Sequence, residues 1–255
     1  YKLLAALLCV GLFTACREQQ EEEITPTSDF SYTLAERELK NVLSVYPVNY
    51  GIQTINTSSD AVSYLWDFGD GNTSDQKSPS FSYAKSGNYT ITLTTTSATG
   101  KQQVSVKPIR VVDQVLKKIT VSQLNWNAFG KLPGWTGTKQ ADLIFEIGQR
   151  NNLGSPVAIN TTFYRSEPRK NTTNTTTAFE IPVSQKVVLN TSAITGPNGD
   201  LLINLYGNDG TANQLVYSTG GSGIGMAAYF NRSTNYYTFE SNAFGTSITL
   251  ECGFE

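Results

Sequence analysis

The stretch Trp66-Asp67-Phe68-Gly69-Asp70-Gly71 and the later run Tyr83-Ala84-Lys85-Ser86-Gly87-Asn88-Tyr89-Thr90-Ile91-Thr92-Leu93-Thr94 decide the fold of the first half of the chain. Alternate residues from Val62 to Phe68 share one face of a predicted strand, and their apolar side chains indicate a buried face. The two glycines that follow permit a sharp turn. In the later run, apolar residues alternate with threonines, which predicts a second strand with a core face and an outer face.

Strand patterns also fill the rest of the chain. Short apolar runs are separated by clusters of Gly, Asn, Asp, Ser and Pro, and only residues 34–42 have a helical pattern. In the second half, such runs predict another sandwich of about eight strands. They are Ile119–Trp126, Ala141–Gly148, Ala158–Arg165, Leu201–Tyr206 and Thr246–Cys252. The predicted fold class is therefore all-β, with two β-sandwich domains.

The first half resembles a PKD domain on the two stretches quoted above, over about residues 28–113, although Phe81 stands where the family commonly has histidine. The resemblance implies a small immunoglobulin-like β-sandwich that serves as a spacer or binding module in extracellular proteins. Asp67 and Asp70 resemble a catalytic or metal-binding pair. Their position in the turn favours a different role, in which the carboxylates accept hydrogen bonds from turn backbone groups.

Residues 114–255 resemble a degenerate C2-type β-sandwich. The similarity lies in Gly134-Trp135, Ala141–Phe145, Leu201–Asp209 and Gly223-Ile224-Gly225. Calcium-binding C2 domains gather several aspartates from loops, because calcium takes six to eight oxygen ligands. Here the matching stretches supply only Asp142 and Asp209. We predict no metal site and expect both acids to cap turns, with their participation in a calcium site left open.

Composition bounds the function mainly by exclusion. The chain has 255 residues, of which 39% are hydrophobic and 16% charged, as is typical of a globular protein. It contains no histidine, which excludes serine–histidine catalysis and histidine-ligated zinc. A net charge of −2 and a pI near 5.3 give no reason to expect a nucleic-acid partner. Carboxylate chemistry remains, but no paired acids stand out, so we predict a non-enzyme without cofactors.

The first residues resemble a bacterial lipoprotein signal. The apolar run Leu3–Phe13 is far shorter than the roughly 20 residues that span a bilayer, and it ends at Thr14-Ala15-Cys16. The resemblance implies a signal peptide over residues 1–15 and lipidation of Cys16. An ordinary signal peptide cut next to Cys16 is the alternative. Residues 16–27, a segment with four glutamates, then form an extended tether. This tether resembles the one that directs Bacteroidota lipoproteins to the cell surface; its alternative role is a plain spacer.

Three aromatic residues are candidates for ligand binding. Trp135 lies in a polar, glycine-rich loop, where its indole either stacks on a sugar or anchors a protein partner, or else folds back as a plug over the sandwich. Tyr236 and Tyr237 are adjacent, so they point to opposite faces of a strand and at least one should be exposed.

These observations together predict a non-catalytic lipoprotein, held by a lipid anchor in the outer membrane and displayed at the cell surface. In this interpretation the PKD domain is a spacer that presents the second sandwich to a glycan or protein partner. The alternative is an accessory structural subunit of an outer-membrane protein complex, where the same sandwiches dock against another protein.

Overall fold

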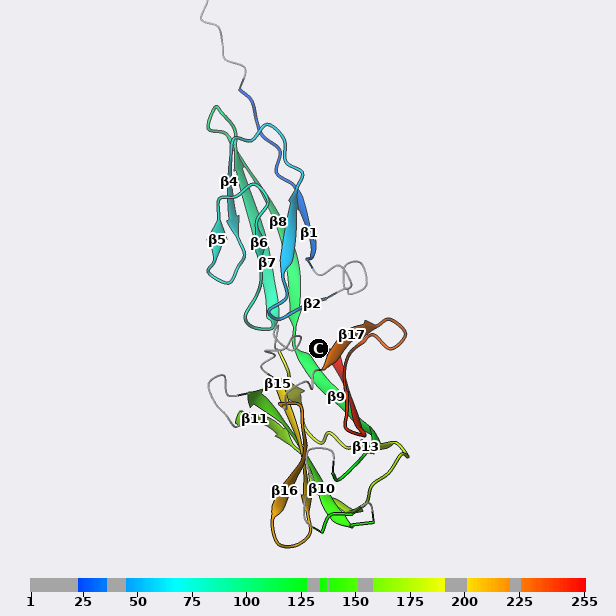
Figure 1. Cartoon of the computed structure of the whole chain (residues 1–255). Coiled ribbons are helices and arrows are strands. Elements are labelled where there is room, and N and C mark those ends of the chain that lie inside the picture. Colours follow the sequence, from blue (N-terminus) through cyan, green and yellow to red (C-terminus); the bar gives the residue numbers. More distant parts are fainter. Residues whose placement is uncertain are drawn as a thin grey trace, which may run out of the picture.

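The computed structural model describes residues 23–35, 45–127, 134–136, 138–150, 158–190, 201–220 and 226–255. Every regular element among them is a strand, which confirms the all-β prediction (Figure 1). No helix long and apolar enough to cross a membrane occurs in this part of the chain. The predicted signal peptide, Cys16, the tether up to residue 22 and most of the predicted helical segment lie outside the described residues.

The first sandwich consists of two small sheets. One sheet has the order β1 (Phe30–Leu34), β3 (Ile52–Asn56) and β6 (Ser80–Phe81). The other has the order β2 (Tyr46–Pro47), β8 (Gln102–Val112), β7 (Gly87–Thr96), β4 (Ser63–Asp67) and β5 (Thr73–Ser74). All pairings are antiparallel except that of β2 with β8.

The core of this sandwich lies around Trp66, as the alternating pattern predicted. The indole is fully buried, and its Nε1 donates a hydrogen bond to the carbonyl of Gln76 at 2.9 Å. Ile91 and Leu93 of β7 are buried beside it. The prediction was wrong for Val62, which is 68% exposed. The reason is that β4 begins one residue later, so the side chain lies beyond the part of the strand that faces the opposite sheet.

The turn after β4 has the predicted geometry. Gly69 and Gly71 have φ angles of 76° and 93°, and a Cβ on Gly69 would lie 2.7 Å from the Thr90 carbonyl oxygen. The carboxylates of Asp67 and Asp70 accept hydrogen bonds from the backbone N–H groups of residues 69 and 72, at 2.8 and 3.0 Å. Both aspartates therefore cap the turn.

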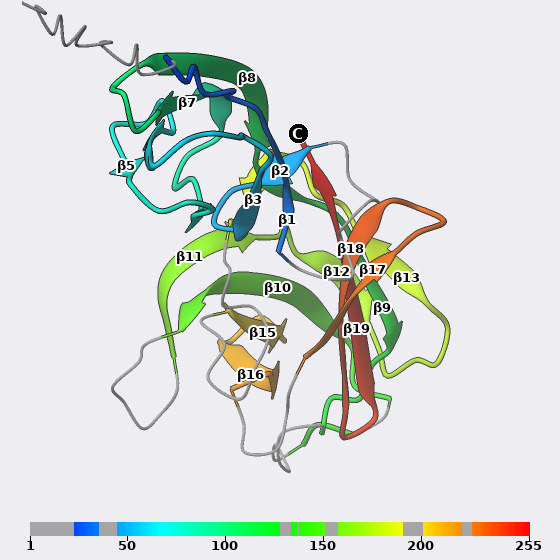
Figure 2. The same ribbon diagram turned by 90° about the horizontal axis from the view of Figure 1, so that it is seen from above.

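The second sandwich has one sheet built around β9 and another around β10. The β9 sheet has the order β13 (Phe179–Ile181), β9 (Gln114–Gln123), β19 (Thr246–Phe254), β18 (Tyr236–Ala243) and β17 (Ala227–Asn231), and β14 (Val187–Val188) also pairs with β9. The β10 sheet has the order β11 (Ile159–Arg165), β10 (Ala141–Arg150), β15 (Leu201–Asn208) and β16 (Asn213–Ser218), and β12 (Arg169–Thr172) also pairs with β10. All five predicted strands are present. Figure 2 shows the two sheets on opposite sides of this domain.

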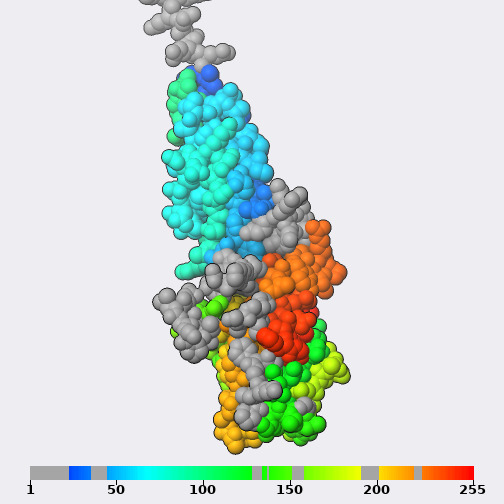
Figure 3. Space-filling model, viewed as in Figure 1, coloured from blue at the N-terminus to red at the C-terminus, as the bar shows by residue number. Residues whose placement is uncertain are grey.

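A single residue, Asp113, joins β8 to β9, and the two sandwiches are stacked end to end (Figures 1 and 3). The Asp113 N–H donates a hydrogen bond to the Glu255 carbonyl at 2.7 Å, and the Glu255 N–H donates one to the Asp113 carbonyl at 3.0 Å. Asn190 donates to the Asp113 carboxylate at 2.7 Å. Tyr237 packs against the hydrophobic cores of both sandwiches. The junction is therefore bonded and packed on several sides.

Candidate functional site

The candidate site is the end of the second sandwich that contains Trp135. This end faces away from the junction. Glu255, which follows β19, is bonded to Asp113 at the junction, so the first residue of β19 and the turn before it lie at the opposite end of the strand. We call it the distal end and define it by Asn125, Asn127, Trp135, Asn174 and Phe244.

Trp135 is buried, with only 7% of the residue exposed. Its ring packs edge-on against Trp126 at 5.4 Å between centroids and covers Gly207, where an added Cβ would lie 2.5 Å from the indole. Trp135 therefore folds back over the end of the sandwich, which is the second of the two conformations that the sequence allowed. The expectation of an indole open for stacking is corrected, since the ring fills the space above a glycine.

Charged residues around this indole neutralise one another. The Lys139 ammonium lies 5.4 Å from the centre of the Trp135 ring and 3.0 Å from a carboxylate oxygen of Asp209. A hydrogen bond from the Thr211 hydroxyl, together with Lys139, lowers the pKa of Asp209 to about 2. This carboxylate also accepts a hydrogen bond from the Thr211 N–H at 3.3 Å, as expected of an acid that caps a turn.

Asp142 is held in the same way. Its carboxylate lies 2.6 Å from the Lys170 ammonium and accepts the Asn171 N–H at 3.2 Å. The lysine lowers the pKa of Asp142. Among the described residues, no group of three or more His, Cys, Asp or Glu side chains is placed to hold a metal ion.

Asparagine side chains tie the loops of the distal end together. Asn125 accepts a hydrogen bond from the Asn127 N–H at 3.1 Å, and Asn127 donates to the Trp135 carbonyl at 2.9 Å. Asn174 accepts the Trp126 N–H at 2.6 Å. The amide oxygen of Asn127 is buried and has no hydrogen-bond partner in the described structure. An unpaired acceptor of this kind costs free energy unless a donor reaches it.

Phe244 is an exposed aromatic residue of this end that the sequence analysis missed. Ala243 pairs with Thr246, so Phe244 and Gly245 form a two-residue turn, and their φ angles are 52° and 74°. Such a type I′ turn favours Asn-Gly, whereas a bulky residue with positive φ is strained. The Asn125 amide donates to the Phe244 carbonyl at 3.1 Å, and the residue is 61% exposed. The available signal was the pair Phe-Gly between two strand patterns.

Tyr236 and Tyr237 lie on opposite faces of β18, as predicted, but both are only half-buried. Tyr236 covers Gly253, where an added Cβ would lie 3.4 Å from its ring, whereas Tyr237 packs between the sandwiches. Both tyrosines are at the junction end of a strand that spans about 23 Å to its distal turn. The structure therefore does not bring them together with Trp135 or Phe244.

Comparison with known proteins identifies the first sandwich. Residues 40–111 match the family model described as PKD domain. Over 64 residues the chain is 45% identical to the pre-pro-metalloprotease PrtV of Vibrio cholerae serotype O1, which covers 24% of this chain. The chain spans only 7% of the length of that relative. Residues 40–111 of the first sandwich thus match the PKD domain.

Three solved structures are similar to parts or most of the chain. The PKD1 domain of Vibrio cholerae PrtV is 35% identical, with 34% of this chain and 98% of that chain covered and a TM-score of 0.28. The PKD1 domain of Vibrio anguillarum Epp is 31% identical, with 35% and 96% covered and a TM-score of 0.28. A structure from a study of carbohydrate-binding modules of the β-sandwich superfamily is 13% identical, with 92% and 99% covered and a TM-score of 0.30.

Proposed function

We propose that the chain is a non-catalytic cell-surface lipoprotein whose distal end binds a glycan. In this proposal Cys16 carries the lipid in the outer membrane, and residues 16–27 form the tether, whose last residues are bonded to the PKD domain through Ile24 and Thr27. The PKD domain is the spacer that holds the second sandwich away from the membrane. The segment before β1 and the second sandwich lie on opposite sides of the PKD domain (Figure 1). That arrangement supports presentation of the distal end to a ligand outside the cell.

The observation that carries the proposal is the exposed Phe244 in its strained turn. A non-glycine residue in the left-handed region costs about 1 to 2 kcal/mol. The fold gains no core packing in return, because the phenyl ring is on the surface. Strain retained at an exposed aromatic side chain supports a role in binding.

The surroundings of this ring favour a sugar over a charged ligand. The distal end presents amides, and the lysines near Trp135 and Asp142 are paired with carboxylates. An aromatic ring packs on the C–H face of a sugar, while amides exchange hydrogen bonds with its hydroxyl groups.

Phe244→Asn should raise stability and weaken glycan binding at the same time. Asparagine relieves up to about 1 kcal/mol of turn strain, and loss of the ring should reduce affinity about tenfold, as removal of a binding hot spot does. Thermal unfolding and titration with glycans selected on an array measure the two effects. Val62→Asn, which removes an exposed apolar side chain from the PKD domain, is the control for binding. Unchanged affinity in Phe244→Asn would contradict the proposal.

The anchor is tested separately with Cys16→Ser. Without the thiol no lipid can be attached, so the protein should move from the membrane fraction to the soluble fraction. Surface display is measured on intact cells by protease accessibility of the second sandwich. Normal membrane retention of the serine variant would overturn the anchor assignment. A stoichiometric outer-membrane protein that co-purifies with the wild-type chain would instead favour the accessory-subunit function.

A further inference from the structure

The last strand of the β9 sheet, β17, is an open edge. It pairs with β18 on one side, and no described strand pairs with it on the other. In such a strand, half of the backbone groups point away from the sheet. The outward groups from Ala227 to Phe230 make no hydrogen bond to a described residue. Ala227 and Tyr229 are exposed on the face away from the core, so solvent reaches this edge.

The other edge strands in the described part of the chain have features that oppose pairing with a further strand. β11, β12 and β16 are irregular where they pair with their neighbours. β2, β5, β6, β13 and β14 have only two or three residues. Beside β1, the Lys107 ammonium donates a hydrogen bond to the Phe30 carbonyl. Natural proteins protect the edges of their sheets by irregularity, short length and charge.

The edge strand β17 has none of these protections. Its five residues, from Ala227 to Asn231, include no charged residue and no proline. Their register with β18 is unbroken. A regular, uncharged edge is a template for another strand. The sequence and the regularity of β17 therefore favour pairing with a strand from outside the chain.

We propose that β17 pairs with β17 of a second copy of the chain, antiparallel and around a two-fold axis at Tyr229. This register pairs all five residues, with Ala227 opposite Asn231 and Ala228 opposite Phe230. The two Tyr229 rings are then direct cross-strand neighbours on the outer face, and aromatic pairs of this kind stabilise a sheet. The same surface is used on both copies, as is usual in a two-fold dimer.

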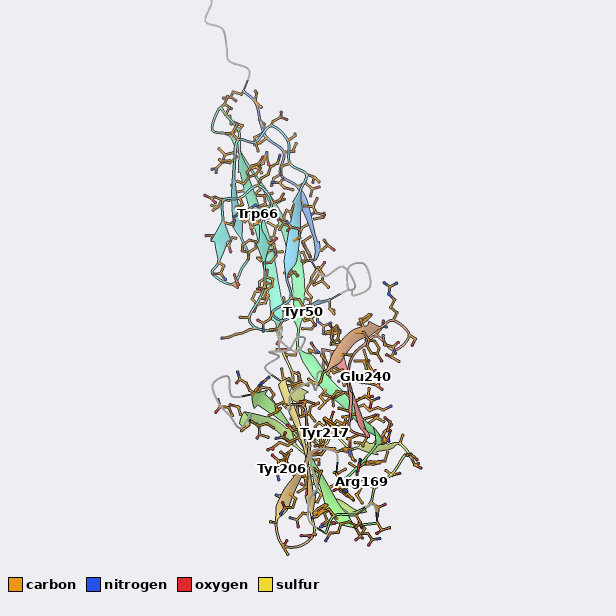
Figure 4. The ribbon with its side chains drawn as sticks, in the orientation of Figure 1. Tyr50, Trp66, Arg169, Tyr206, Tyr217 and Glu240 are labelled. Atoms are coloured by element: carbon orange, nitrogen blue, oxygen red, sulfur yellow. The ribbon has the colours of Figure 1, made fainter. Side chains whose placement is uncertain are left out.

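Two charged residues beside β17 have no ion pair with a described residue. Arg232 directly follows the strand and is exposed. Glu240 lies on β18 opposite Ala227, and its carboxylate accepts a hydrogen bond from the Tyr229 hydroxyl at 2.6 Å (Figure 4). Within one chain, Arg232 and Glu240 are more than about 13 Å apart along the strands. They therefore do not pair with each other in the monomer.

In the proposed dimer each arginine meets a glutamate of the other copy. Arg232 of one copy lies one residue beyond Ala227 of the other copy, and Glu240 of that copy lies one strand further. Strands are about 4.8 Å apart and rise about 3.3 Å per residue, so the two Cα atoms are about 10 Å apart, a distance that both side chains together span. The two-fold axis repeats the ion pair. This complementarity favours a second copy as the occupant of the edge.

The size of the contact determines its strength. Two five-residue strands bury less than the about 1,200 Å² at the low end of stable interfaces. The dimer should therefore be weak, forming at high protein concentration and dissociating on dilution. This inference depends neither on the glycan site nor on the lipid anchor, so it can be tested on a chain that has no lipid.

The ion pairs are tested by charge exchange in the full chain with Cys16→Ser. Analytical ultracentrifugation from micromolar to millimolar concentration should show reversible dimerisation. Arg232→Glu should weaken the dimer at least about tenfold, because two glutamates then face each other, and Glu240→Arg should have a similar effect. The variant that combines both changes should regain the original affinity. An effect within one chain does not explain such a rescue, because the two residues are far apart there.

The register is tested with a disulfide. Directly opposite Cα atoms of an antiparallel pair are about 4.5 to 5.5 Å apart, which a disulfide spans. Tyr229→Cys should therefore form a covalent dimer on oxidation, in a chain whose Cys9 and Cys16 are replaced by serine. Cys252 is buried and remains unreactive. Leu215→Cys is the matched control, because Leu215 lies on edge strand β16 and is 37% exposed, compared with 39% for Tyr229.

Three results would overturn the proposal. The first is a chain that stays monomeric at millimolar concentration, which would leave the edge to a strand of a different protein. The second is a combined charge variant that dimerises as weakly as the single variants. The third is a Tyr229→Cys chain that crosslinks no faster than the Leu215→Cys control. Circular dichroism of each variant establishes that it is folded before its association is compared.

Discussion

Trp66→Ala should lower the free energy of unfolding of the PKD domain by about 3 to 5 kcal/mol, as large-to-small changes of buried aromatics do. The indole is completely buried and packs edge-on against Phe30 at 5.0 Å between ring centres. Its removal leaves a cavity between the two sheets. It also leaves the Gln76 carbonyl without the indole N–H that now bonds it.

Chemical denaturation followed by circular dichroism measures this loss. Leu65→Ala is the matched control, because Leu65 precedes Trp66 on the same strand and is largely exposed. The control should change stability by less than about 0.5 kcal/mol, as is usual for surface positions. Equal effects in both variants would mean that β4 has another register.

Trp135→Ala should destabilise the second sandwich by a similar amount, about 3 to 5 kcal/mol. The ring is buried against Trp126 and covers the backbone of Gly207, so its loss opens the core at the distal end. Unfolding of the second sandwich, followed by the fluorescence of Trp126 with Trp66 replaced by phenylalanine in both proteins compared, measures the effect. Gly207→Val should also be destabilising, since its side chain needs space that the indole fills.

Phe244→Ala provides the comparison for this prediction. Phe244 is an aromatic residue of the same distal end, but it is exposed, so truncation should have little effect on stability. A Trp135→Ala variant with wild-type stability and reduced glycan binding would contradict the structure and restore the stacking role that the sequence left open.

The first sandwich was predictable because its signals are local. The turn after Trp66 and the alternation in the run from Gly87 to Thr94 each depend on residues that are neighbours in the sequence. The position of Trp135 was not predictable in this way. Whether its loop covers the sandwich depends on Gly207, which belongs to a strand much later in the chain.

The role of Phe244 had only a partial signal in the sequence, the pair Phe-Gly between two strand patterns. The strain at Phe244 depends on the register of β18 and β19, which makes the turn two residues long. For β10, the run Leu143-Ile144-Phe145 was a signal of burial, since three consecutive apolar residues indicate a strand that is covered on both faces.

The joint at Asp113 determines how the molecule responds to a stretching force. In the proposed lipoprotein, force between the tether and a bound ligand would enter the PKD domain through the segment before β1 and leave it at Asp113, which follows β8 (Figure 1). Because the Glu255 backbone brackets Asp113 by two hydrogen bonds, the joint resists bending as well as extension. In the proposed lipoprotein, such a joint would let the tether set most of the reach of the distal end.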